Sequence, residues 1–522
     1  MGFYLQVTAV KSSLETKVLP KLRSLELILQ PINRLPADVF VLIPRFLTRE
    51  EERWQFDPPT NKPLVTMTHV CRSWRNVLLS TPSLWTQIDF SESVSTKSQQ
   101  AEVFIRRSGN QLLDIHQYLT DKENVEPFLS IMLHNLFRLQ GLSIISYLPY
   151  FGPLLSKFSA SAPELKRLEI QSQSTMESNT KLPKIFGGRM PKLTSLSLQW
   201  FHTNLRDLDL PSLTRFDFAT ETDTSIQDLI SFFEGCPLLE FIQITLLYSP
   251  QTPAPPPRRR VCLAALRELR LDNTAYTTGL LDQLILPKCT EMMLEVKPTG
   301  ETPTQRGSSA AKIHPSSIDH LPVTRGITKA VVIQNSCTFS GPSGNLRFRW
   351  FQRACGDIDA LSFTSFSPIS VLQIRELWIG QRTVHRLSDK RTSWKQTAAG
   401  LRGSFGVLTD VEGLTIVCCK MEPFLQTLGE TVDGGILLPA LQRLTVYVGC
   451  GDMDVPALIQ CTKERKEHFR PLGEVTVVWE KDPGTGVRDE VESLREFVGE
   501  LVHRVGEAPK LFWRGDECDW WG

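Results

Sequence analysis

The chain has 522 residues, and its 58 Lys and Arg residues almost balance its 57 Asp and Glu residues, which gives a formal net charge of +1. This balance excludes a global electrostatic field that would draw the protein to nucleic acid or to an anionic membrane. Hydrophobic residues make up 41% of the chain and charged residues 22%, as in globular proteins. The length allows several domains or one extended repeat array.

The cysteine pattern and the lack of targeting signals indicate the compartment. Eleven cysteines occur without a C-x-x-C pair, so the sequence predicts no zinc or redox motif. The amino-terminal stretch lacks the basic and apolar parts of a signal peptide, no N-x-Ser/Thr triplet occurs, and no apolar run has the length of a bilayer. We therefore expect the protein in the cytosol or the nucleus, where thiols stay reduced.

The first predicted elements are two helices. Residues 14–30 carry leucines at spacings of three and four, which indicates a short amphipathic helix. A second helix begins near Pro36, because proline is favoured in the first helical turn. Pro44 lies inside this segment, and since proline removes a helical hydrogen bond, we expect a kink or an early end there. The apolar positions on one face of this helix are Val39, Ile43 and Leu47.

The strongest helix signal in the chain runs from residue 64 to residue 78. Apolar side chains recur there every three or four positions, so the pattern predicts one continuous helix with a single apolar stripe, which Pro82 ends. The stripe consists of Leu64, Met67, Val70, Cys71, Trp74, Val77 and Leu78. The elements predicted next are a strand at 84–90, a helix at 97–107 with Gly109 as its left-handed cap, and a strand at 112–119.

Beyond residue 130 a three-point pattern recurs, with apolar residues at positions x, x+3 and x+5 and often a proline two residues before x. Its first points are Leu139, Leu165, Leu193, Leu213, Leu239, Leu266, Ile374, Val411, Leu441 and Leu472. The first five steps measure 26, 28, 20, 26 and 27 residues. Such steps are typical of a leucine-rich solenoid with a parallel sheet; coincidence in a leucine-rich chain is the alternative. The Pro-, Ser- and Thr-rich stretches 249–260 and 297–326 predict flexible insertions.

Motifs of catalysis are missing from the sequence. It contains no P-loop, no G-x-S-x-G elbow, no H-E-x-x-H pair and no G-x-G-x-x-G that opens a helix. We therefore expect no catalytic residue, no metal site and no cofactor, and a hydrolase is disfavoured. The charge balance and the lack of a spanning segment also predict neither nucleic acid nor a membrane as partner.

Three short motifs in chain order carry a family resemblance. They are Leu-Pro in INRLPADVFVLI, Val-Cys-Arg-x-Trp-Arg in HVCRSWRNVLL, and Leu-Trp in PSLWTQIDF. Together they resemble the F-box, especially the F-box-like form of large fungal families with degenerate leucine-rich repeats. The resemblance implies that the helical domain docks on a Skp-type adaptor, which joins a cullin scaffold and a RING protein, while the repeats recruit a substrate for ubiquitination. The implied adaptor-binding residues are Leu35, Pro36, Val39, Ile43, Val70, Cys71, Trp74, Leu84 and Trp85.

Together these patterns predict a mixed α/β protein, in which a small helical F-box-like domain precedes an irregular leucine-rich-repeat solenoid with a parallel sheet. The predicted function is that of the non-enzymatic substrate-recognition subunit of an SCF-type cullin-RING ubiquitin ligase. The alternative is a leucine-rich-repeat interaction scaffold with no link to ubiquitination, whose amino-terminal helices only cap the solenoid. The predicted segments are an N-terminal helical segment (1–30), the F-box-like domain (31–90), a connecting helix and strand (91–130), the solenoid (131–480), and a C-terminal helix and tail (481–522).

Overall fold

The computed structural model divides into two compact units, and each is described by itself. Unit 1 comprises residues 1–174 and 184–192, and unit 2 comprises residues 175–183 and 193–522. The predicted insertions lie mostly outside the residues that the structure describes, and the tail beyond residue 506 lies wholly outside them. Residues 321–326, at the end of the second predicted insertion, are described, and Leu321 and Val323 are buried there. The described residues are 11–19, 21, 31–48, 61–89, 94–120, 125–148, 151–173, 182–188, 190–201, 204–220, 224–246, 260–272, 279–296, 318, 321–333, 336–350, 373–380, 398–417, 421–432, 434–448, 454–480, 482 and 484–506.

The first helices of unit 1 differ in how well they are packed. The segment Leu14–Val18 is helical but has no buried side chain, and most of the remaining helix predicted up to residue 30 lies outside the described residues. Helix α3 spans Ala37–Thr48 and begins directly after Pro36, as predicted. It continues through Pro44, so of the two predicted outcomes the early end is wrong, and the kink stays a prediction. Pro44 is buried, and tertiary packing offsets the hydrogen bond that its ring removes.

The continuous helix predicted from residue 64 to residue 78 is also wrong. This segment forms two short helices, α4 over Lys62–Met67 and α5 over Arg72–Leu79. Between them Cys71 has an extended backbone, with φ −155° and ψ 168°, which no helix accommodates. Its Sγ accepts a hydrogen bond of 3.5 Å from the backbone N–H of Trp74, so Cys71 is the N-cap of α5. Helical spacing of apolar residues therefore continues across a break in the helix.

The rest of unit 1 alternates strands and helices. Strands β1 to β4 form a parallel sheet in chain order. The helix predicted at 97–107 and the strand predicted at 112–119 are confirmed, and Gly109 after the helix has the positive φ of a left-handed cap. The strand predicted at 84–90 is shorter, because Leu84 belongs to a 3-10 helix, Pro82–Leu84. The bounds are β1 Gln87–Asp89, α6 Val94–Arg107, β2 Leu113–Leu119, α7 Val125–Asn135, β3 Leu139–Ser146, α8 Phe151–Leu155 and β4 Arg167–Ser172.

Unit 2 contains a long sheet in the order β5-β6-β7-β9-β11-β14-β13-β12-β15-β16-β19-β20-β21. Neighbouring strands are parallel except at β13, which is antiparallel to β12 and to β14. The predicted mixed α/β class and mostly parallel sheet are confirmed; the leucine-rich solenoid stays a prediction. The bounds are β5 Ser195–Gln199, β6 Arg215–Thr220, β7 Phe241–Leu246, β9 Glu268–Asp272, β11 Glu291–Val296, β12 Lys329–Ile333, β13 Ser336–Gly341, β14 Gly344–Trp350, β15 Glu376–Gly380, β16 Gly413–Val417, β19 Arg443–Val448, β20 Glu474–Trp479 and β21 Glu500–Val505.

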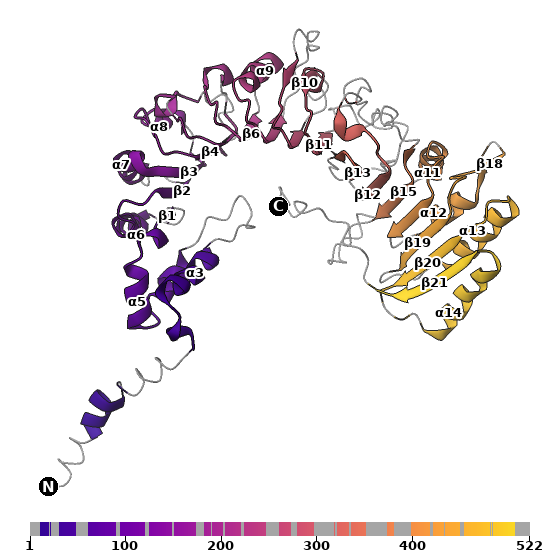
Figure 1. The fold of residues 1–522 in the computed structure, drawn as a ribbon, viewed down its shortest axis with the longest axis horizontal. Coiled ribbons are helices and arrows are strands. Elements are labelled where there is room, and N and C mark those ends of the chain that lie inside the picture. The colour runs from indigo at the N-terminus through magenta and orange to yellow at the C-terminus, as the bar shows by residue number, and fades with distance from the viewer. Residues whose placement is uncertain are drawn as a thin grey trace. The chain divides into compact units, whose positions relative to one another are not determined.

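Helices cover one face of this sheet. In Figure 1, α11, α12 and α13 lie along the same side of the strands from β15 to β20. The face of these strands that lies opposite the helices is called the outer face below. The bounds of the helices are α9 Ile226–Glu234, α11 Ala398–Gly406, α12 Glu422–Gly429, α13 Val455–Glu467 and α14 Thr485–Glu492. Two short strand pairs also occur, β8 Val261–Cys262 with β10 Leu284–Ile285, and β17 Thr431–Val432 with β18 Gly435–Ile436.

The three-point pattern sets the register of the sheet. Its second points align across neighbouring strands, as Leu377, Leu414 and Leu444 do across β15, β16 and β19, and its third points align in the next buried row. All three leucines are at most 1% exposed. Because side chains alternate between the faces of a strand, these rows face the helices, and the positions between them face outward. A slip of one residue would expose both rows, so the pattern fixes the pairing.

Prolines before the strands lie in tight turns. Each occupies the position two residues before the first point, where the chain turns into its strand; the N–H of Leu165, for example, donates to the carbonyl of Ala162 at 3.3 Å. Proline suits the second position of such a turn because its φ is already near −65°. The five prolines that lie just before their strands in this way are Pro163, Pro191, Pro211, Pro237 and Pro439.

The sequence pattern missed some strands because small or less common apolar residues occupy positions of the three-point pattern there. Strand β11 follows the pattern with Cys289 as its first point, and Pro287 lies two residues earlier. Strand β12 has Ala330 as its second point. The antiparallel β13 and β14 carry no such pattern and enter the sheet between β11 and β12. The segment predicted as a C-terminal helix and tail contains α14 but also strand β21, which pairs with β20.

Replacing a central second point tests this register. We expect Leu444→Ala to lower the free energy of unfolding of unit 2 by about 2–5 kcal/mol, because the truncated side chain leaves a cavity between Leu414 and Val475. Urea denaturation followed by intrinsic fluorescence measures the change. As a control, the neighbouring exposed change Gln442→Ala should stay within about 0.5 kcal/mol of the wild type. Equal effects of the two substitutions would contradict the predicted orientation.

Candidate docking surface

One face of helix α3 joins it to the rest of unit 1. Phe40 and Val41 are 4% and 8% exposed, and Pro44 is buried with them. The ring of Phe40 packs against Trp74 of α5, with centroids 4.8 Å apart and planes at 57°. Nη2 of Arg45 donates a hydrogen bond of 2.7 Å to Oγ of Ser83, in the turn after α5. This face therefore holds α3 on α5 and on the turn that follows it.

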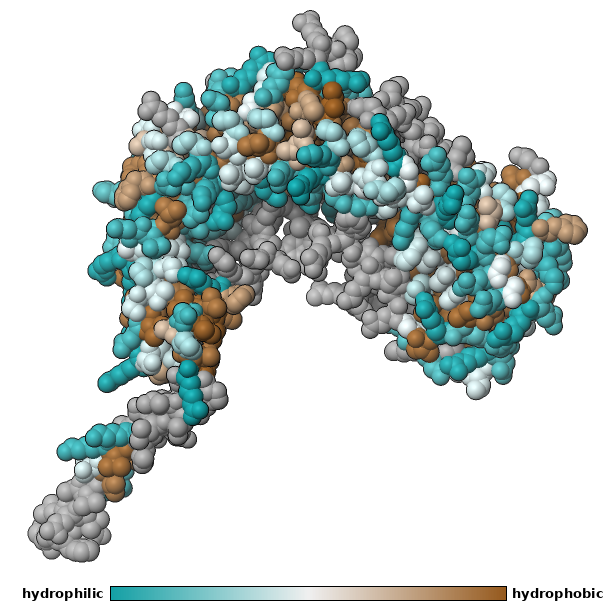
Figure 2. Space-filling view, in the orientation of Figure 1, coloured by the Kyte–Doolittle hydropathy of each residue, from teal (hydrophilic) through white to brown (hydrophobic). Residues whose placement is uncertain are grey.

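The opposite face of α3 is apolar and exposed. Val39 and Leu42 are 42% and 44% exposed, and Phe46 is 74% exposed. At 100° per residue these three side chains lie on one side of the helix, roughly opposite Phe40 and Pro44. Figure 2 shows apolar side chains gathered at the place of α3 in Figure 1. The exposed large apolar residues of this surface, called the α3 surface below, are Ile32, Leu35, Val39, Leu42, Phe46 and Leu47.

Helix α3 is thus apolar on two opposite sides, although it lies at the surface of unit 1. A surface helix ordinarily has one apolar stripe and a polar face, whereas a helix that is apolar all round is usually enclosed. Contiguous exposed apolar side chains of this kind mark an interaction site. The α3 surface is therefore the best candidate for protein docking in unit 1.

Trp85 anchors the helices to the start of the sheet. Its side chain is 0% exposed, and its Nε1–H donates a hydrogen bond of 2.9 Å to the carbonyl of Leu78 at the end of α5. The ring packs on Phe104 of α6, with centroids 5.0 Å apart, and the guanidinium of Arg107 lies 4.5 Å from the ring centroid. A buried tryptophan with its N–H satisfied contributes both apolar area and orientation. Residues on α5 and α6 therefore cover Trp85 within the chain.

Arginines of α5 and α6 give this region a local positive charge. Burial lowers the pKa of Arg107, and the nearby charges of Arg106 and Arg75 lower it further. Among the residues that the structure describes, none of the three pairs with a carboxylate. The chain as a whole is nearly neutral, but these three arginines form a local basic cluster. Such a cluster favours an acidic partner near these helices.

Comparison with known families agrees with the geometry of these helices. A family model described as F-box-like matches residues 32–91, the segment that contains α3, α4, α5 and β1. Residues 32–91 form an F-box-like domain. Such domains are typically non-catalytic modules of protein–protein interaction that bind Skp-type adaptors. A comparison of the chain with curated proteins finds no match.

The structure separates the adaptor-binding residues predicted from the sequence into two groups. The residues that are exposed or half-buried are Leu35, Pro36, Val39, Ile43, Val70, Cys71 and Trp74. Of these, Leu35 and Val39 belong to the α3 surface, and the half-buried Ile43 lies beside Val39 on the same helix. Leu84 and Trp85 are instead buried in the F-box-like domain, at 8% and 0% exposure. They close the domain from inside and offer no surface to a partner. Trp85 is therefore buried without an external partner.

Sequence reasoning missed part of the α3 surface. Leu42 and Phe46 are exposed beside Val39, but the sequence pattern singled out only Val39, Ile43 and Leu47 as one apolar face. A helical projection of residues 35–47 contains the missing signal, because it shows apolar side chains on both sides of the helix. A helix of this kind within a small domain indicates an uncovered face.

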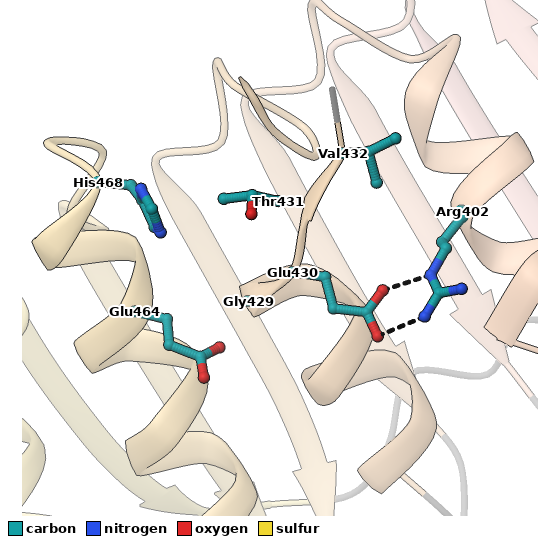
Figure 3. A pocket seen from close by; sticks show the side chains of 7 residues that line it. All are labelled: Arg402, Gly429, Glu430, Thr431, Val432, Glu464 and His468. Carbon is teal, nitrogen blue, oxygen red and sulfur yellow. Dashed lines mark hydrogen bonds and ion pairs between the residues drawn. The ribbon is translucent and has the colours of Figure 1, made fainter. Parts of the chain in front are cut away.

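Unit 2 contains a hollow of about 660 Å³ on the helix side of its sheet. Figure 3 shows that Arg402 and Glu430 point toward each other there; the guanidinium donates two hydrogen bonds to the carboxylate, which lower the pKa of Glu430. Glu464 accepts a hydrogen bond from Gln460 at 2.6 Å. Arg402 and Glu430 therefore pair with each other, whereas Glu464 is bound by a neutral amide. Among the lining residues that the structure describes, no nucleophile lies beside a base. Its lining residues are Arg402, Gly429, Glu430, Thr431, Val432, Glu464 and His468.

The residues that the structure describes contain no group of three or more His, Cys, Asp or Glu side chains arranged to hold a metal ion. Nor does any helix in them combine the length and the apolar character needed to cross a membrane.

Stability measurements should separate the two faces of the F-box-like domain. We expect Trp85→Ala to destabilise the domain by about 3–5 kcal/mol, because it removes a fully buried ring and leaves the packing of Phe104 and Leu78 incomplete. Phe46→Ala should change stability by no more than about 0.5 kcal/mol, since its side chain is exposed. Thermal unfolding of both variants measures this. A large destabilisation by Phe46→Ala would show that the α3 surface is covered within the chain.

Proposed function

We propose that the protein is the substrate-recognition subunit of an SCF-type cullin-RING ubiquitin ligase. In this proposal the F-box-like domain binds a Skp-type adaptor, the adaptor joins it to a cullin-RING core, and the sheet of unit 2 binds a protein substrate. The chain itself performs no catalysis, and it acts in the cytosol or the nucleus. The observation that carries the proposal is the apolar α3 surface within a domain that matches the F-box-like family model.

The energetics of α3 support adaptor binding. Six large apolar side chains of the α3 surface are between 39% and 74% exposed. Covering apolar area stabilises a complex by roughly 25 cal/mol per Å², and a few central anchors dominate the affinity. Phe46 is the most exposed of the six and lies in the same row as Leu42 and Val39, so it is the best candidate anchor.

Trp74 supports the α3 surface from beneath. Its half-buried ring lies 4.8 Å from Phe40, on the inner side of α3. It therefore acts on the adaptor through the position of α3 more than through direct contact. Val70, which is 53% exposed just before the Cys71 cap, extends the apolar area beside it.

Adaptor affinity tests the proposed anchor. We expect Phe46→Ala to weaken binding of a purified Skp-type adaptor by about 30-fold or more, the equivalent of about 2 kcal/mol. Biolayer interferometry with the full chain measures the dissociation constant. The matched control is Phe469→Ala, which removes an equally large and still more exposed side chain from unit 2. It should leave adaptor affinity unchanged.

Two outcomes would contradict the proposal. If wild-type protein does not bind the adaptor under conditions in which another F-box protein does, the link to ubiquitination is wrong. The alternative of an interaction scaffold then takes its place. If Phe46→Ala and Phe469→Ala bind the adaptor equally well, the adaptor does not use the α3 surface.

Substitutions of Trp74 test its indirect role. Trp74→Ala should weaken adaptor binding and also lower the stability of the F-box-like domain, because Phe40 loses its packing partner. Trp74→Phe keeps an aromatic ring against Phe40 and should therefore retain most of the adaptor affinity and most of the stability of the F-box-like domain. Hydrogen exchange of α3 together with adaptor affinity measures the two effects. Loss of affinity in Trp74→Ala without faster exchange in α3 would instead indicate direct contact with the adaptor.

A further inference from the structure

The outer face of the unit 2 sheet carries a row of residues that contains two cations and one acid, and the acid pairs with only one of the two cations. Lys329, Glu376, Gly413 and Arg443 occupy the same register on β12, β15, β16 and β19. Glu376 therefore has Lys329 as its direct neighbour on one side and Gly413 on the other. Yet its carboxylate pairs with Arg443, two strands away, and not with Lys329.

Gly413 permits this longer reach. A Cβ at this position would lie 2.5 Å from Oε2 of Glu376 and 2.9 Å from its Cδ, closer than real side chains approach. Any other residue would therefore push the carboxylate away from Arg443. Unit 1 contains the same arrangement, because Asp114 on β2 reaches Arg167 on β4 across a glycine of β3, with an oxygen–nitrogen distance of 2.7 Å.

The two rows differ in the residue on the other side of the acid. In unit 1 this neighbour is the neutral Gln87, whereas in unit 2 it is the cation Lys329. Because Glu376 turns to Arg443, Lys329 pairs with no carboxylate among the described residues. Its Nζ lies 3.8 Å from the ring centroid of Trp378 instead. The ring attracts the cation but does not neutralise it.

Trp378 lies at the centre of an amphipathic stretch of the outer face. Its register neighbours are Val331 on one side and Thr415 on the other, and all three lie on the face opposite the helices. The ring is half-buried, and among the described residues the side chains of Trp378 and Lys329 form no hydrogen bond or ion pair. Tryptophan is enriched among the residues that dominate binding at protein interfaces, and the unneutralised cation beside it attracts an acidic partner.

We infer that Lys329 and Trp378 form a docking site for a protein segment that carries a carboxylate side chain next to a large apolar side chain. The carboxylate pairs with the ammonium of Lys329, and the apolar side chain packs on the ring of Trp378 and on Val331. Gly413 keeps the site open, because it lets Glu376 pair with Arg443 and so leaves Lys329 without an internal acid. The inference rests on the proposed function only where the bound segment is called a substrate.

Peptide selection tests the chemistry of the site. The probe is a phage-displayed library of random 12-residue peptides, selected on the immobilised full chain. The selected peptides should combine Asp or Glu with a neighbouring aromatic or branched apolar residue. Fluorescein-labelled copies are then measured by fluorescence anisotropy. We expect Lys329→Gln and Trp378→Ala each to weaken binding about tenfold or more, and Lys288→Gln, which removes an exposed charge elsewhere in unit 2, to leave it unchanged.

Variants of the glycine test the proposed mechanism. Gly413→Ala should weaken peptide binding, because the added Cβ returns Glu376 toward Lys329. Glu376→Gln alone should bind like the wild type, since Lys329 stays free of an acid. The double variant Gly413→Ala with Glu376→Gln should regain binding, because the displaced side chain no longer carries a charge. Hydrogen exchange of β16 and β19 checks that each variant is folded.

Several results would overturn the inference. Selection of no peptide, or of peptides without acidic residues, contradicts the proposed ligand class, and so does preferential binding of an oligonucleotide. If Lys329→Gln binds the peptides as tightly as the wild type, or if the double variant does not regain binding, Lys329 and Gly413 do not have the proposed roles. Adaptor binding through the α3 surface is independent of these results. Peptide binding without adaptor binding would support the docking site and refute the ubiquitin-ligase role. Adaptor binding without peptide binding would refute only the docking site.

Discussion

A helix that is apolar on two opposite sides can bury only one of them within a small surface domain. In α3, Phe40 and Pro44 lie on the inner side and are buried, and Phe40 packs against α5. Phe46 lies on the outer side and is exposed to solvent. This constraint organises the F-box-like domain. Trp85 secures the inner side through Leu78 and α6, so the domain needs no partner for its core, whereas the outer side is stabilised only when another protein covers it.

The sheet follows a related division between two faces. Positions x+3 and x+5 of each strand are buried under helices, which leaves the alternate positions free to vary without loss of the core. Those positions carry the rows of charged and aromatic residues on the outer face. Gly413 illustrates how a small residue in such a row decides which charges meet: Glu376 pairs with Arg443 across it, and Lys329 is left beside Trp378.

Sequence patterns predicted the buried rows well because a strand side chain needs only the right period and an apolar character. They missed β11 and β12, where Cys289 and Ala330 fill positions expected to hold larger residues. They also predicted one helix where Cys71 breaks the chain into two, because apolar spacing does not report a backbone that turns extended for one residue. The F-box-like segment was recognisable, but which residues face outward depends on tertiary packing: Trp85 is enclosed and Phe46 is not.

The central claim is that the outer side of α3 is uncovered in the chain alone and becomes buried by a Skp-type adaptor. Hydrogen–deuterium exchange of the full chain, measured with and without purified adaptor, tests it most directly. The account predicts slower exchange in peptides covering residues 37–48 when the adaptor is present, and no change in peptides covering residues 443–448 of the sheet. Unchanged exchange over residues 37–48 in the presence of saturating adaptor would contradict it.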